Sequence, residues 1–142
     1  MEDKKVIWIT GASSGIGRAL ALKFANEGWT VAASARRESL LQDLNKENQN
    51  IYPFPLDVTN AEQCQTVFKH IIEKFNDIEI SIFGTGIHDP ESEKKFNLDK
   101  IRKIMEVNYF GTMNAINSVY GYYSDKKSGQ ISIISSVAGY RG

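Results

Sequence analysis

Short runs of apolar residues alternate along the chain with longer segments in which apolar side chains recur every three or four positions. The short runs predict β-strands, and the longer segments predict amphipathic helices. Strands are expected at residues 6–10, 29–35, 50–56, 78–83 and 129–135. Helices are expected at residues 15–27, 37–47, 61–75 and 98–123, and a loop is expected at residues 84–97.

This alternation of strands and helices is typical of β-α-β units, in which the strands form a parallel sheet. The strands are continuously apolar, as expected for a sheet that helices cover on both faces. Pro53 and Pro55 fall inside the third strand and favour a place at the edge of the sheet. We therefore expect an α/β fold with a doubly wound parallel sheet in one domain, residues 1–142.

Composition disfavours nucleic-acid-binding, membrane-binding, disulfide-rich and zinc-binding proteins. The chain has 17 Lys and Arg against 17 Asp and Glu, so no bulk positive field favours binding to nucleic acid or to a membrane surface. Cys64 is the single cysteine, which excludes an internal disulfide and a multi-cysteine zinc site, and we predict no metal site. The first apolar run is too short for a signal peptide, and no stretch approaches a membrane-spanning length. We expect a cytoplasmic protein.

The most informative segment lies between the first strand and the first helix and reads Thr10-Gly11-Ala12-Ser13-Ser14-Gly15-Ile16-Gly17. Glycines allow a tight turn and a close backbone approach to a diphosphate, and the amides of a helix N-terminus attract anions. The spacing differs from that of a P-loop, which disfavours a nucleotide triphosphatase. The alternative is a glycine-rich helix start that a serine side chain caps. The predicted contacts to a bound cofactor here are Gly11, Ser13, Ser14, Gly15, Ile16 and Gly17.

Three further segments follow in a recognisable order: Leu56-Asp57-Val58, Val107-Asn108-Tyr109-Phe110-Gly111 and Ile133-Ile134-Ser135-Ser136-Val137-Ala138-Gly139. Together with the glycine-rich turn, they resemble the landmarks of the short-chain dehydrogenase/reductase family, over the whole chain. The resemblance implies a Rossmann-type sheet, incomplete on its C-terminal side, and a nicotinamide dinucleotide cofactor. It also implies hydride transfer between the nicotinamide and a small-molecule carbonyl or alcohol.

The second strand indicates which cofactor is preferred. An acidic residue at its end would bind the adenosine ribose and repel a 2′-phosphate, but here Ser34-Ala35-Arg36-Arg37 precedes the first acid, Glu38. A guanidinium pairs well with a phosphate, and Ser34 is expected to add a hydroxyl donor. We predict NADP in preference to NAD, although a solvated charged helix start also explains Arg37. The resemblance adds three cofactor contacts: Asp57, Val58 and Gly86.

The resemblance assigns Ser136 to positioning the substrate oxygen and Asn108 to the proton path. The family's catalytic Tyr-x-x-x-Lys should follow the serine, but the sequence ends at Gly142 before such a motif. Two earlier matches are rejected, Tyr122 with Lys126 and Tyr123 with Lys127. They precede the serine and end a helix that should finish at the sheet edge opposite the site.

A further departure is Phe83-Gly84-Thr85-Gly86, where the family usually has Asn-Asn-Ala-Gly. Gly86 keeps the close approach to the cofactor, whereas the contacts of the lost asparagines have no evident replacement.

We expect the cofactor-binding half of an NADP-dependent oxidoreductase that is inactive as 142 residues and truncated before Tyr-x-x-x-Lys. We also expect a homo-oligomer, because apolar residues of the last strand and the last helix would lie uncovered. Three alternatives stay open: a non-catalytic NADP-binding module or sensor, a sugar-nucleotide epimerase or dehydratase, and a nucleotide-free interaction domain.

Overall fold

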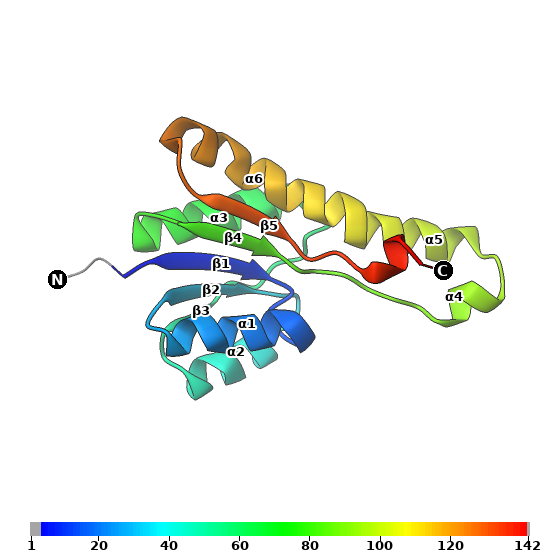
Figure 1. Ribbon diagram of the computed structural model, residues 1–142, viewed down its shortest axis with the longest axis horizontal. Coiled ribbons are helices and arrows are strands. Elements are labelled where there is room, and N and C mark those ends of the chain that lie inside the picture. Colours follow the sequence, from blue (N-terminus) through cyan, green and yellow to red (C-terminus); the bar gives the residue numbers. More distant parts are fainter. Residues whose placement is uncertain (1–3, 142) are drawn as a thin grey trace.

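The computed structural model describes residues 4–141. One parallel sheet has the strand order β3-β2-β1-β4-β5 (Figure 1). The chain first runs outward from β1 to β3, returns to the other side of β1, and continues through β4 to β5. The expected Rossmann-type order is confirmed, and it creates a switch point between β1 and β4, where ligands bind in such sheets. The strands are β1 (Val6–Thr10), β2 (Thr30–Ser34), β3 (Ile51–Pro53), β4 (Ile80–Phe83) and β5 (Gln130–Ile133).

Helices cover both faces of the sheet, α1 and α2 on one side and α3 and α6 on the other (Figure 1). Successive residues of β1 alternate between the two layers: Trp8 packs with the core beneath α3 and α6, and Ile7 and Ile9 pack with the core beneath α1 and α2. Two buried faces explain why the strands are apolar throughout. The helices are α1 (Gly15–Asn26), α2 (Glu38–Glu47), α3 (Ala61–Phe75), α4 (Glu91–Lys94), α5 (Leu98–Met105) and α6 (Gly111–Lys126).

The long helix expected at residues 98–123 is interrupted. A π-helical segment, η1 (Glu106–Phe110), joins α5 to α6, and α6 continues to Lys126. The expected loop at residues 84–97 contains the short α4. β3 lies at the edge of the sheet, as its prolines predict, and is shorter than expected. The N–H groups of Phe54 and Leu56 still donate to the carbonyls of Ala33 and Ala35, so Pro53 and Pro55 alternate with them at positions that face away from β2.

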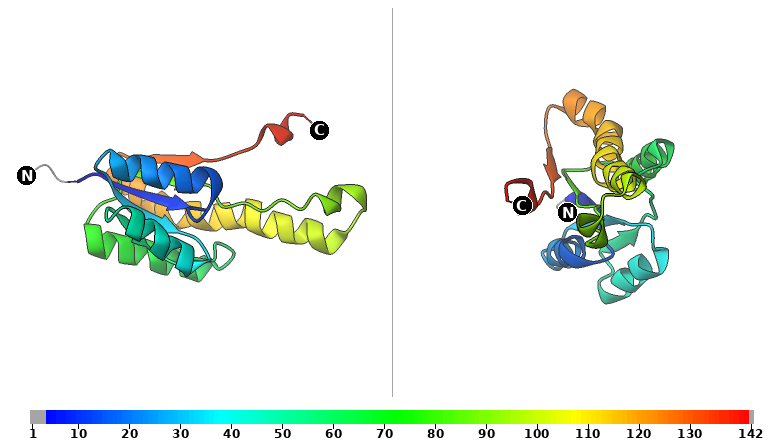
Figure 2. Two further views of the ribbon diagram at one scale, coloured as in Figure 1. Left: turned by 90° about the horizontal axis from the view of Figure 1, so that it is seen from below. Right: turned by 90° about the vertical axis from the view of Figure 1, so that its right-hand side faces the viewer.

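Two segments extend beyond the carboxyl edge of the sheet (Figure 2). One holds α4 and α5, and the other follows β5 and holds a short 3-10 turn, η2 (Val137–Gly139). Within residues 4–141, no helix has the length and apolarity required to cross a membrane. β5 forms one edge of the described sheet, as expected, with Ile133 54% exposed.

Candidate functional site

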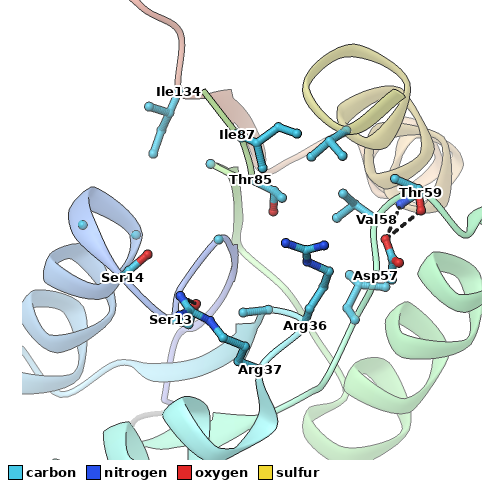
Figure 3. A pocket seen from close by; sticks show the side chains of 18 of the residues that line it. Ser13, Ser14, Arg36, Arg37, Asp57, Val58, Thr59, Thr85, Ile87 and Ile134 are labelled. Carbon is cyan, nitrogen blue, oxygen red and sulfur yellow. Dashed lines mark hydrogen bonds between the residues drawn. The ribbon is translucent and has the colours of Figure 1, made fainter. Parts of the chain in front are cut away.

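A cleft of about 620 Å³ opens at the carboxyl edge of β1, β2 and β4, between the start of α1 and the α5–η1 segment (Figure 3). This is the switch point of the parallel sheet, where strands are added first on one side of β1 and then on the other. The lining residues are Gly11, Ser13, Ser14, Gly15, Ile16, Gly17, Ala35, Arg36, Arg37, Leu56, Asp57, Val58, Thr59, Gly84, Thr85, Gly86, Ile87, Lys103, Glu106, Val107 and Ile134.

The glycine-rich turn forms one wall. A Cβ on Gly17 would lie 2.1 Å from the carbonyl oxygen of Gly11, so only glycine permits this close packing of helix on turn. Gly15 has φ +55°, and a Cβ there would have no atom within 4 Å, so this position is open. Ser14 occupies the N-cap position but its side chain makes no capping hydrogen bond. The alternative of a serine-capped helix start is therefore wrong, and the first amides of α1 are available to an anion in the cleft.

Two guanidinium groups enter the cleft from the end of β2. Arg36 makes no hydrogen bond or ion pair with any described residue, and its guanidinium points between Ser13 and Asp57 (Figure 3). Arg37 donates a long hydrogen bond, 3.5 Å, to Ser13 Oγ and has no carboxylate partner within residues 4–141. Unneutralised guanidinium groups beside a helix N-terminus make this part of the cleft attractive to a phosphate.

The opposite wall is a short ordered segment after β3. Asp57 Oδ1 accepts hydrogen bonds from the backbone N–H of Thr59 at 3.0 Å and from Thr59 Oγ1 at 2.7 Å (Figure 3). Asn114 Nδ2 donates to the carbonyl of Val58 at 2.9 Å, and the absent side chain of Gly111 lets α6 approach Val58. These contacts hold Asp57 and Val58 at the cleft independently of any ligand.

The segment after β4 is held by Asn108. Its Oδ1 accepts a hydrogen bond from the backbone N–H of Ile87 at 2.7 Å, and its Nδ2 donates to the carbonyl of Ile87 at 2.8 Å. Asn108 lies in η1, outside the set of residues that line the cleft, so its visible effect is to position Gly86 and Ile87. Such π-helical segments occur frequently at functional sites. A role of Asn108 in proton transfer stays a prediction.

Ser136 also lies outside the lining. It is exposed, on the segment that follows β5, and its Oγ accepts a hydrogen bond from the backbone N–H of Ala138 at 3.1 Å. Ser136 follows β5 and therefore lies at the carboxyl edge of the sheet, and the hydrogen bonds of its side chain and of the Asn108 side chain do not join the two residues. Its catalytic assignment stays a prediction.

Ser34, which was predicted to contact the cofactor, does not line the cleft. Ser34 is fully buried in β2, and its Oγ accepts a hydrogen bond from Trp8 Nε1 at 2.9 Å. The hydroxyl therefore satisfies a buried indole N–H inside the sheet. All the other predicted cofactor contacts line the cleft.

The two rejected Tyr-x-x-x-Lys matches lie at the amino edge of the sheet, as expected. Tyr122 donates to Asp77 Oδ1, which Lys126 Nζ also contacts at 2.5 Å, just before β4. Tyr123 OH hydrogen-bonds Ser81 Oγ at 2.8 Å, and burial raises the pKa of Tyr123 to about 12. A raised pKa is the opposite of what proton transfer near neutral pH requires.

Comparison with known proteins decides the family, because residues 5–142 match the description "short chain dehydrogenase". The chain belongs to the short-chain dehydrogenase family. It is 31% identical to human dehydrogenase/reductase SDR family member 7, over 94% of this chain and 42% of that protein. It is 32% identical to the 3-oxoacyl-(acyl-carrier-protein) reductase of Thermotoga maritima, over 99% of this chain and 58% of that protein. The chain thus spans about half the length of these short-chain dehydrogenases.

Solved structures agree with this membership. The structure of ElxO with NADP bound superposes on 98% of this chain, and this chain covers 58% of it. The TM-score is 0.89 at 27% identity. The family is one of oxidoreductases that use nicotinamide cofactors, and the cleft has the residue types that such a cofactor requires.

Proposed function

We propose that this chain is the NADP(H)-binding part of a short-chain oxidoreductase. The observation that carries the proposal is the presence of Arg36 and Arg37, without carboxylate partners, beside the uncapped start of α1. An acid at this place would repel a 2′-phosphate, whereas a guanidinium binds it with charge-assisted hydrogen bonds. The NADP-bound state of ElxO supports the same choice.

The lining residues fit the parts of this cofactor in sequence. Arg36 and Arg37 would hold the 2′-phosphate, and Asp57 and Val58 would flank the adenine. The first amides of α1 would bind the diphosphate, since a helix N-terminus favours anions. The nicotinamide would then extend toward Gly86 and the end of β4. When bound, the cofactor supplies or accepts the hydride.

The reaction of the whole protein is part of the proposal. We assign Ser136 to holding the oxygen of a carbonyl or alcohol substrate and Asn108 to positioning the Ile87 segment and to the proton path. Within residues 4–141, no Tyr-x-x-x-Lys pair lies at the carboxyl edge. We therefore expect the catalytic tyrosine and lysine to come from outside residues 1–142, and we expect no turnover from the chain alone.

The test is a calorimetric titration of the wild-type chain and of Arg36→Asp with NADPH and NADH. We expect tighter binding of NADPH, and we expect Arg36→Asp to weaken NADPH roughly 10- to 100-fold, because a hydrogen bond to a charged group is lost. NADH affinity should change far less. Arg102→Asp, on exposed α5 outside the cleft lining, is the matched control. Equal losses for both cofactors would contradict the assignment of Arg36.

We also propose that the protein is a homo-oligomer. Support comes from large apolar side chains exposed on the α5–η1–α6 segment, where a monomer would normally bury or avoid them. Light scattering of wild type and of Met105→Glu tests this, since a charge in a contact face should shift the mass toward the monomer. The exposed side chains are Leu98, Ile101, Met105, Tyr109, Phe110, Met113 and Tyr120.

A further inference from the structure

Phe83 and Gly84 stand where related enzymes usually carry two asparagines, and the structure gives each a packing role. Phe83 is buried, and its ring lies edge to face with Trp8 at 5.6 Å, beneath α3 and α6. Gly84 faces the other side of the sheet, where a Cβ would lie 2.7 Å from Ile134 Cδ1. Real Cβ atoms essentially never approach that closely. Ile134 therefore occupies the space that a side chain at position 84 would need.

Ile134 is fixed in this place by its surroundings. Its backbone N–H donates to the carbonyl of Phe83 at 3.0 Å, which continues the pairing of β5 with β4. Its side chain is half-buried and packs against the apolar cluster beneath α1 and α2. The same side chain lines the cleft, so one face of Ile134 rests on Gly84 and its neighbours and another faces the cavity (Figure 3).

The position of Ile134 along the cleft follows from the strand order. Arg36 follows β2, the glycine-rich turn follows β1, and Ile134 follows β5 on the far side of β4. A dinucleotide with its adenosine at Arg36 and its diphosphate at the turn must direct its nicotinamide toward β4 and β5. Ile134 is then at the nicotinamide end and cannot contact the adenosine half.

We propose that Ile134, admitted by the missing side chain of Gly84, is the apolar wall on which the nicotinamide ring packs. The inference rests on the proposed function, because it requires a nicotinamide dinucleotide in the cleft. Gly84 acts through Ile134 and is a positioning residue, whereas Ile134 contacts the cofactor. The pair tunes the affinity for the nicotinamide half alone.

The experiment uses Gly84→Ala, Ile134→Val and the double variant. Ile134→Val removes Cδ1, the atom that meets the new methyl group, and leaves Cγ1, 3.6 Å from it, in ordinary contact. The ligands are NADPH and adenosine 2′,5′-bisphosphate, which lacks the nicotinamide. We expect Gly84→Ala to weaken NADPH about three- to tenfold, through displacement of apolar contact area, and to leave the bisphosphate unchanged.

The double variant gives the sharpest result. Alanine's methyl group then fills the space vacated by Cδ1, so the double variant should bind NADPH no more weakly than Ile134→Val alone. The thermal midpoint without ligand should show the same compensation, which reports the contact independently of binding. The matched controls are Gly121→Ala, where a Cβ meets no atom within 4 Å, and Ile133→Val on the neighbouring residue, which lies outside the lining.

Additive losses in the double variant would overturn the inference, as would equal losses for both ligands. If the wild-type chain binds the bisphosphate and NADPH but the variants show either pattern, the inference fails and the proposed function stands. If the wild-type chain binds neither ligand, the proposed function fails and the inference fails with it.

Discussion

Polar side chains lie at both edges of the sheet, but they have hydrogen-bond partners within the fold at the amino edge and face an open cleft at the carboxyl edge. At the amino edge, the hydroxyl of Tyr122 and the ammonium of Lys126 both contact Asp77, and the hydroxyl of Tyr123 contacts Ser81. At the carboxyl edge, the guanidinium of Arg36 and the first amides of α1 face a cleft and have no partner among the described side chains. A polar group that the fold already satisfies stabilises the fold, and one left open to a cavity is available to a ligand.

This difference explains why a motif match is insufficient on its own. Tyr122 and Lys126 have the spacing of a catalytic pair, yet Phe68 packs edge to face on Tyr122 at 5.6 Å and Asp77 holds both polar groups. Burial and the hydrogen bond to Asp77 raise the pKa of Tyr122. The pair attaches the end of α6 to the start of β4.

The largest expected effect is on the carboxyl edge, from Gly15→Val. The valine side chain would project into the open space at the start of α1, where we place the diphosphate. NADPH affinity should fall by at least about 100-fold, because the anion loses the helix N-terminus and meets a steric block. Isothermal calorimetry measures this directly.

Gly28→Val separates this block from backbone strain. Gly28 also has a positive φ, +88°, and open space around its Cβ position, but it follows α1 and lies outside the cleft lining. Both substitutions force a branched side chain into the left-handed region and should destabilise the fold by similar amounts. Only Gly15→Val should affect NADPH. Comparable losses of affinity in the two variants would mean that strain, not the phosphate position, is responsible.

An intermediate effect is expected at the amino edge, from Ser81 and Tyr123. Ser81→Ala or Tyr123→Phe leaves one buried hydroxyl without its partner, which costs about 1–3 kcal/mol of unfolding free energy. The double variant removes both groups and should recover most of that loss. Urea denaturation of the four proteins gives the coupling energy. NADPH affinity should not change in any of them, and a change would show that the two edges are not independent.

The smallest expected effect is a dependence of stability on acid pH. Partial burial alone would raise the pKa of Asp77, but hydrogen bonds from Lys126 and Tyr122 outweigh it and hold the pKa below its usual value. The contribution of Asp77 is therefore complete above about pH 4 and is lost as the pH falls through the lowered pKa. Because the side chain of Asp77 is 43% exposed, solvent screens these contacts, and the loss should be about 1 kcal/mol or less.

Asp77→Asn should reduce the loss of unfolding free energy at acid pH, which we call the acid limb, in urea denaturation at a series of pH values. Asp43→Asn, which removes the exposed ion pair of Asp43 with Lys46, should leave the limb as in wild type. An unchanged limb in Asp77→Asn would mean that the Tyr122, Lys126 and Asp77 contacts do not stabilise the folded chain.

Much of this fold is predictable from periodicity alone. β1 has the expected bounds, and the alternation of strand and helix predicts a parallel sheet. The order of the strands was implied by the family resemblance. The glycine spacing located the turn of the cleft because Gly17 and Gly15 are required by close packing and positive φ. Those requirements are local, so a single sequence carries them.

The features that the sequence does not reveal are contacts between residues far apart along the chain. Ser34 resembles a ligand donor because a short polar residue at a strand end is usually exposed. Only the fold shows that its hydroxyl accepts a hydrogen bond from the indole N–H of Trp8. The sequence does not show that Lys103, Val107 and Ile134 line the cleft. They belong to α5, η1 and the residue after β5, which reach the cleft only through tertiary packing. Ile87 lies in the expected loop, but the sequence does not show that Asn108 binds its backbone.

The most direct test of the account is a titration of the isotopically labelled chain with NADP⁺, followed by amide chemical shifts. The account predicts changes at the amides of Gly15, Gly17 and Thr85 on the carboxyl edge, and none at Ile78 or Glu79 on the amino edge. Shifts at the amino edge, or no shift at the start of α1, would contradict the claim that the unpartnered groups of the carboxyl edge form the cofactor site.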